Sequence, residues 1–149
     1  PTFKSIIEEN LHEAKKQGAS ITWVLSNHDV IRHATRYGLG DKQEDEPHTG
    51  SLWLLNGGKR AEVDLERGER RARAASMLLL GLPGATYIYQ GEELGLHEHG
   101  ELADSDRQDP TFFRNPGVDV GRDGCRVPLP WTADAEAGFG FGSPQPHMP

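Results

Sequence analysis

The sequence lacks several features that would point to particular classes of protein. It has a single cysteine, Cys125, so no internal disulfide bond can form, and this favours a reducing compartment. No apolar run approaches the roughly 20 residues that a membrane-spanning helix needs. Acidic residues outnumber basic ones by 23 to 16, and no basic cluster rises above that background. We therefore expect a cytoplasmic location and neither a membrane nor a nucleic acid partner.

The length of 149 residues suits one ordinary domain with a sizeable core. The chain starts at Pro1 without a methionine, so we expect it to have been cut from a longer polypeptide. Its first 96 residues and its last 53 differ in character.

Apolar residues are periodic in the first part. The spacing of Phe3, Ile6 and Leu11 predicts a helix over 2–17, capped by Thr2. An apolar strand is predicted over 21–25, covered on both faces. Residues 38–68 form a mixed stretch that contains the charged segment Asp41–Glu46. We interpret this stretch as a solvated connection, with a short helical turn over 51–55 as the alternative.

A second helix is predicted over 69–82 and a second strand over 85–89. The apolar run in the later part of that helix indicates burial on most sides. Helices that alternate with strands favour an α/β fold with a parallel sheet, and two strands are too few to complete one. Seven of the ten prolines fall after residue 97. We therefore expect two parts: βα units over 1–96 and a long loop region over 97–149.

Both predicted strands end in carboxylates. "SNHD" follows the first strand and contains Asp29, and "QGEE" follows the second and contains Glu92 and Glu93. Parallel α/β folds place their binding groups at the carboxyl ends of strands. Asn27, His28 and Asp29 can donate to and accept from several hydroxyls, as sugar recognition requires. A buried aspartate that caps the next turn accounts for the triplet equally well.

Two carboxylates at neighbouring strand ends also allow a simple glycosidase interpretation. Retaining glycosidases hold their two carboxyl groups about 5–5.5 Å apart, and Asp29 with Glu92 could form such a pair. The family resemblance that follows argues against this pairing.

Three segments together resemble the α-amylase family of glycoside hydrolases (family 13), in its α-glucosidase and oligo-1,6-glucosidase branch. "SNHDVIR" resembles the segment that ends barrel strand seven. "RAASMLLLGLPGATYIYQGEELGL" resembles the following helix and strand eight. "GRDGCRVPLPW" resembles the loop after strand eight, in a form similar to actinobacterial α-glucosidases. The resemblance implies that the chain is the C-terminal portion of a (β/α)8 TIM barrel, incomplete, with strands seven and eight and their flanking helices.

The resemblance also implies roles for particular residues. Asp29 would be the third catalytic carboxylate, which grips sugar hydroxyls and stabilises the oxocarbenium-like transition state. His28 would bind a neighbouring hydroxyl of the same ring. Arg122 would approach the nonreducing end of that glucose and close the pocket, with Arg126 as the alternative. No cofactor or metal is implied.

We expect structural roles for the other residues that stand out in these segments. Asn27 would orient Asp29 or the chain turn, and Arg32 would pair with an acid at the rim or with solvent. Glu92 and Glu93 would hold loops through backbone amides. The spacing of His97 and His99 could suit a metal, but no third ligand is nearby, so we expect a solvated loop. Cys125 is interpreted as a small buried filler.

The parent enzyme implied by the resemblance is a retaining α-glucosidase that hydrolyses terminal α-linked glucose from short saccharides. A transglucosidase, a sucrose or trehalose isomerase and a non-catalytic barrel subunit remain alternatives. Nothing in the sequence matches the strands that carry the family's nucleophile and proton donor. We therefore expect the 149-residue chain to be inactive alone. The sequence defines neither the preferred linkage and chain length nor the oligomeric state.

Overall fold

The computed structural model describes residues 2–40 and 49–141. In chain order the elements are α1 (Phe3–Lys16), β1 (Thr22–Val24), α2 (His33–Gly38), α3 (Thr49–Leu55), η1 (Arg60–Glu62), α4 (Leu65–Leu80), β2 (Ala85–Tyr87), η2 (Asp104–Asp106), α5 (Pro110–Arg114), η3 (Asp123–Cys125) and η4 (Gly138–Gly140), where η denotes a 3-10 helix.

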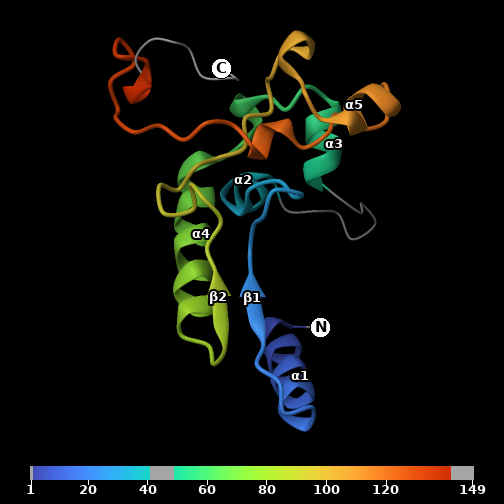
Figure 1. Cartoon of the computed structure of the whole chain (residues 1–149), viewed down its shortest axis with the longest axis vertical. Coiled ribbons are helices and arrows are strands. Elements are labelled where there is room, and N and C mark those ends of the chain that lie inside the picture. Colours follow the sequence, from blue (N-terminus) through green and yellow to red (C-terminus); the bar gives the residue numbers. More distant parts are fainter. Residues whose placement is uncertain (1, 41–48, 142–149) are drawn as a thin grey trace.

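The two strands lie side by side and run parallel. Thr22 is opposite Ala85, and Val24 is opposite Tyr87. α4 lies alongside the pair, α1 lies beyond the amino ends of the strands, and the long irregular segment lies beyond their carboxyl ends (Figure 1). The α/β arrangement expected from the alternating pattern is therefore present, and the polar residues that follow each strand lie at one end of the sheet.

Side-chain caps set where the helices begin. The hydroxyl of Thr2 accepts a hydrogen bond from the backbone N–H of Ser5, which confirms the predicted cap of α1. α4 begins at Leu65 rather than at Glu69 as predicted. Asp64 is the reason, because its Oδ1 accepts the N–H of Arg67 at 2.9 Å and so starts the helix earlier.

A short helix that the sequence did not predict, α2, packs against α4. Its buried residues include His33 and Thr35, so it lacks the apolar spacing by which amphipathic helices are found. Gly68 of α4 makes the close crossing possible, because a Cβ there would lie 2.3 Å from the carbonyl oxygen of Ala34. The contact of α2 with α4 fixes the segment that follows β1.

The predicted connection over 38–68 contains part of the core. α3 confirms the helical turn predicted over 51–55, and Trp53 and Leu54 are buried against Leu39 and Val63. The interpretation as a solvated connection is wrong for this part, because these four apolar side chains gain more from packing together than from solvent exposure. The segment Asp41–Glu46 lies outside the described residues.

Apolar side chains remain exposed on the strands and on the last turns of α4. Val24 is 46% exposed, Tyr87 66%, Met77 70% and Leu80 65%. The expected burial of the strand on both faces and of the later part of α4 is therefore not found. The opposite face of the sheet is better covered, since Trp23 donates its indole N–H to the carbonyl of Pro83 at 2.9 Å.

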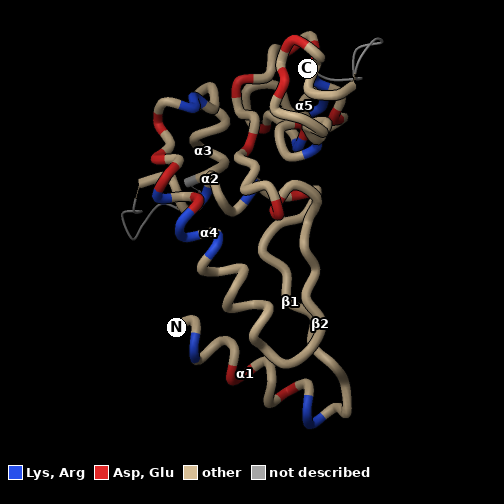
Figure 2. Tube along the Cα trace, turned by 90° about the vertical axis from the view of Figure 1, so that its left-hand side faces the viewer, with Lys and Arg blue, Asp and Glu red and all other residues tan. Residues whose placement is uncertain are grey.

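Charged residues are absent from both strands and gather on the helices and beyond the carboxyl ends of the strands (Figure 2). The described part of the irregular region, 97–141, contains α5 and three 3-10 helices and no strand. The division of the chain at residue 97 stays a prediction. This irregular region supplies half of the site described below.

The crossing of α2 and α4 yields a first test. In the complete polypeptide, Gly68→Ala should lower the free energy of unfolding by about 1–3 kcal/mol, because the new methyl group overlaps backbone of α2. This loss should exceed the gain of about 1 kcal/mol that alanine brings to a helix. Thermal unfolding measures the change. Gly40→Ala is the control, since a Cβ at Gly40 meets nothing within 4 Å. Equal effects at both positions would contradict the close crossing.

Candidate active site

The chain turns sharply where β1 ends. The side-chain Oδ1 of Asn27 accepts the backbone N–H of Asp29 at 2.8 Å, which forms an Asx turn. Asn27 was expected to orient either Asp29 or the chain turn, and this structural role is confirmed, because its side chain forms the turn. The turn leaves the side chain of Asp29 half-exposed at the carboxyl end of the sheet.

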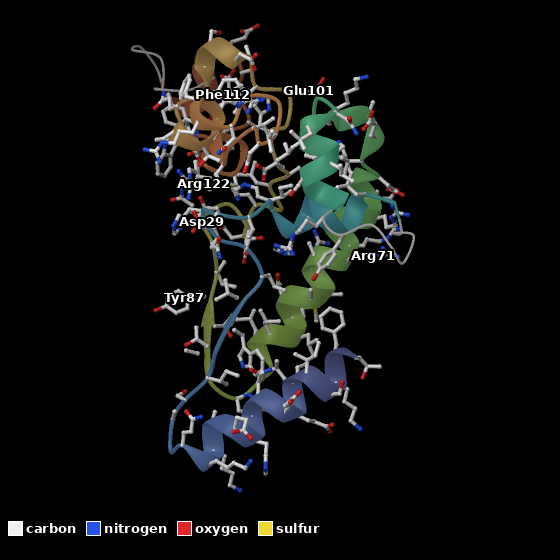
Figure 3. The ribbon with its side chains drawn as sticks, turned by 90° about the vertical axis from the view of Figure 1, so that its right-hand side faces the viewer. Asp29, Arg71, Tyr87, Glu101, Phe112 and Arg122 are labelled. Atoms are coloured by element: carbon white, nitrogen blue, oxygen red, sulfur yellow. The ribbon has the colours of Figure 1, made fainter. Side chains whose placement is uncertain are left out.

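Asp29 meets two guanidinium groups that come from the far end of the sequence. Nη1 of Arg122 lies 2.7 Å from Oδ1 of Asp29, and Figure 3 shows these two side chains close together. Nη2 of Arg126 lies 3.1 Å from the same oxygen. Nε2 of His28 lies 3.4 Å from the other oxygen, Oδ2. The hydrogen bond from Arg122 is the main cause that lowers the pKa of Asp29, so this carboxyl is held in its ionised form.

The two arginines are themselves fixed in place. Asp109, whose carboxyl is fully buried, accepts from Nε of Arg122 at 2.6 Å and from Nη2 at 3.1 Å. The hydrogen bonds from Arg122 hold the pKa of Asp109 well below its usual range. Arg126 donates from Nε to the carbonyl of His28 at 2.8 Å. The site is therefore a network of two carboxylates and two guanidinium groups.

The structure brings together all three residues that the sequence predicted for the site, Asp29, His28 and Arg122, and Arg126, the alternative to Arg122, lies with them. Glu92 belongs to a different environment. Its side chain is buried, and Oε1 lies 3.5 Å from Nδ1 of His33. Burial raises the pKa of Glu92.

The neighbouring Glu93 behaves as predicted. Its Oε2 accepts the backbone N–H of Gly91 at 2.8 Å, so its carboxylate holds the turn that follows β2. Glu93 therefore has the structural role that was expected of it at the end of the second strand.

Arg32 and Glu98 were not predicted as part of the support of the site. Arg32 is 1% exposed, so its interpretation as a rim or solvent residue is wrong. Its Nη1 donates to the carbonyl of Gln90 at 2.8 Å, and its Nη2 donates to the carbonyl of Cys125 at 3.0 Å. Oε2 of Glu98 accepts the backbone N–H of Arg32 at 2.9 Å. Together these bonds join the segments after β1 and β2 to the turn that carries both site arginines.

Burial changes the acidity of two groups in this support. It raises the pKa of Glu98 to about 7 and that of the Cys125 thiol to about 12. A thiol of that pKa is a poor nucleophile at neutral pH, which agrees with the interpretation of Cys125 as a small buried filler.

A cavity of about 760 Å³ opens beside the charge network. Asp29 and Arg122 line one part of it, Leu54 and Leu55 of α3 line another, and Glu98 also contributes. Apolar and charged side chains therefore share the lining of this cavity, and converging polar groups of this kind orient ligands in small-molecule sites.

No group of three His, Cys, Asp or Glu side chains that could hold a metal ion occurs in residues 2–40 and 49–141. His97 is buried rather than part of a solvated loop, and its Nδ1 lies 3.1 Å from the hydroxyl of Thr35. His99 is exposed, as expected. None of the helices described for this chain is long and apolar enough to cross a membrane.

Comparison with known proteins identifies the family. The model of the alpha amylase catalytic domain matches residues 1–148. The chain belongs to the alpha-amylase family. This confirms the resemblance drawn from the three sequence segments. The two strands therefore occur in a member of a family whose catalytic domains are TIM barrels.

The relatives support the α-glucosidase branch. A probable alpha-glucosidase of Rhizobium meliloti is 33% identical over 145 residues, which are 94% of this chain and 22% of the relative. Maltase 1 of Drosophila virilis is 32% identical over 129 residues, which are 84% of this chain and 16% of that protein. The chain thus spans less than a quarter of these relatives.

Solved structures agree. The alpha-glucosyl transfer enzyme XgtA matches with a TM-score of 0.67 and 32% identity, over 100% of this chain and 23% of that one. Trehalose-6-phosphate hydrolase of Bacillus licheniformis matches with a TM-score of 0.58 and 26% identity, over 98% of this chain and 24% of that one.

The buried carboxyl of Glu98 gives a pH-dependent prediction. Its pKa is about 7 in the folded state against an ordinary value of 4.5. Between these values the unfolded state binds fewer protons than the folded state, so stability falls as pH rises through this window and levels off above it. Glu98→Gln keeps an acceptor for the N–H of Arg32 and removes the titration.

We therefore expect the midpoint of thermal unfolding of the complete polypeptide to fall less between pH 4.5 and 7 in Glu98→Gln than in the wild type. Glu101→Gln is the matched control, because Glu101 also accepts a backbone N–H, from Arg60, but is exposed. Identical pH profiles for wild type and Glu98→Gln would contradict the expected titration.

Proposed function

We propose that the complete polypeptide is a retaining α-glucosidase that hydrolyses terminal α-linked glucose from short saccharides. In this proposal β1 and β2 are strands seven and eight of its barrel, and 97–149 follows strand eight. The observation that carries the proposal is the meeting of Asp29 with His28, Arg122 and Arg126 at the carboxyl end of parallel strands.

In this mechanism Asp29 is the third carboxylate rather than the nucleophile or the proton donor. Its lowered pKa keeps it ionised, so it accepts hydrogen bonds from sugar hydroxyls and stabilises positive charge at the ring. A single carboxylate cannot also attack the anomeric carbon and protonate the leaving oxygen. Those two groups come from other strands of the proposed barrel, so we expect the 149-residue chain alone to be inactive.

His28 would bind a hydroxyl of the same glucose, because its ring lies beside Oδ2 of Asp29. Arg122 would contact the nonreducing end, with Arg126 as the alternative. The backbone N–H, Nε and Nη2 of Arg122 all donate hydrogen bonds to Asp109. By contrast, Nη1 of Arg126 lies 3.8 Å from Asp109. The two residues therefore differ in the donors they can turn toward a ligand, and this difference can be tested.

A transfer reaction is the second candidate. A solved relative is called an alpha-glucosyl transfer enzyme, and trehalose synthase/amylase TreS of Mycobacterium tuberculosis is 31% identical over 80 residues. Transfer and hydrolysis both discharge the covalent intermediate, and they differ only in whether a sugar or water attacks it. The His28–Asp29 pair disfavours a non-catalytic subunit, because such a role needs no transition-state carboxylate.

The products formed by the complete enzyme separate these possibilities. Incubation with maltose, sucrose and trehalose should release free glucose as the first product. Accumulation of isomeric disaccharides or longer saccharides ahead of glucose would make transfer the main activity. A folded complete protein with neither activity would overturn the proposed function.

Asp29→Asn tests the catalytic role directly. The change keeps the shape of the side chain and removes the charge that acts in the transition state. In the complete enzyme we expect kcat to fall about 100-fold or more, with a smaller change in KM. Steady-state kinetics on maltose measure both constants. Glu93→Gln is the control, since Glu93 holds a backbone turn beyond β2. A kcat near the wild-type value in Asp29→Asn would remove Asp29 from the mechanism.

The choice between the arginines needs paired variants. Arg122→Ala should raise KM for maltose about tenfold or more, because the terminal ring loses a charged donor. Arg126→Ala is measured beside it. An unchanged KM in Arg122→Ala together with a raised KM in Arg126→Ala would transfer the role to Arg126. Unchanged values in both variants would exclude the turn from substrate binding.

A further inference from the structure

We propose that Asp109 is a positioning residue that aims Arg122 at Asp29 and keeps the charges of the site in balance. The inference rests on the proposed function, and it assigns a role to a residue outside the three segments that indicated the family. Asp109 lies just before α5, and in the sequence it falls between β2 and the turn that carries the arginines.

The hydrogen bonds between Asp109 and Arg122 fix the direction in which the Arg122 side chain points. The carboxylate of Asp109 accepts the backbone N–H of Arg122 at 2.9 Å, Nε at 2.6 Å and Nη2 at 3.1 Å. A guanidinium group is planar, so a carboxylate that accepts hydrogen bonds from both Nε and Nη2 fixes the plane of the group and the position of its remaining nitrogen. That nitrogen, Nη1, is the one that lies 2.7 Å from Asp29.

Asp109 is itself held from the opposite side. Its backbone N–H donates to the carboxylate of Asp123, with both oxygens at 3.1 Å. Its Oδ1 caps α5 by accepting the N–H of Thr111 at 2.9 Å. Gly121 has a φ of 76°, and a Cβ there would lie 2.8 Å from Cβ of Asp109. The close approach of the two segments therefore depends on glycine at this position, and the anchor has little freedom to move.

The charges of the network support the same role. Two guanidinium groups converge on one oxygen of Asp29, and Nη1 of Arg126 lies 3.8 Å from Oδ2 of Asp109. With Asp109 ionised, the two cations face two anions. Without its charge both cations would be left to Asp29 alone, which would bind that carboxylate more tightly and leave it less free to accept sugar hydroxyls.

Asp109→Asn in the complete enzyme tests the proposal. Asparagine keeps the shape and the cap of α5, but it places an NH2 donor against the N–H groups of Arg122. We expect KM for maltose to rise about tenfold, with a smaller change in kcat. Asp64→Asn is the matched control, because the side chain of Asp64 also caps a helix, α4, and also lies beside an arginine, Arg67, away from the site. It should leave KM unchanged.

A double variant separates positioning from general support of the fold. If Asp109 acts through Arg122, then Asp109→Asn should change KM less than about twofold when Arg122 is already alanine. A full and additive effect in that background would overturn the proposal, and so would a wild-type KM in the single variant. If Asp109→Asn does not give folded enzyme, Asp123→Asn decides in the same way, because it loosens the anchor of Asp109.

The two proposals fail in different ways. A complete wild-type enzyme that releases no glucose and transfers none would overturn the proposed function and this inference with it. An active wild type whose KM is unaffected by Asp109→Asn would overturn only the inference.

Discussion

The contact between Asp29 and Arg122 is the interaction on which the site depends. It joins residues 93 positions apart in the sequence, and it joins the end of β1 to the irregular region beyond β2. Arg126 adds a second bond to the same carboxylate, and Asp109 fixes Arg122 from the other side. The sheet supplies the place where these segments meet, and the ion pairs supply their mutual orientation.

Beneath this network the structure uses buried polar groups where many folds use apolar ones. Arg32 is almost fully buried, and its guanidinium group donates to two backbone carbonyls. Oε2 of Glu98 accepts the backbone N–H of Arg32. Such bonds specify direction as well as distance, which apolar contacts do not, so they suit a support that must hold charged side chains in one arrangement. The cost is the raised pKa of Glu98, whose charge the surroundings disfavour.

The sequence was sufficient to predict the α/β pattern, the family and the meeting of His28, Asp29 and Arg122, because short segments carry these features. It was insufficient for Asp109 and Glu98, whose roles arise from partners distant in the chain. α2 was missed since polar residues fill its buried face. The later part of α4 was predicted as buried and is exposed. An apolar run shows that side chains favour burial, but it does not show that the described residues contain a surface that buries them.

In the proposed mechanism the carboxylate of Asp29 faces a glucosyl ring. A crystal structure of the complete enzyme with glucose bound tests it most directly. We expect Asp29 and His28 to hydrogen-bond to hydroxyls of one glucose ring, while Asp109 keeps its hydrogen bonds to Arg122. Glucose bound elsewhere, with Asp29 still bonded only to the two arginines, would contradict it.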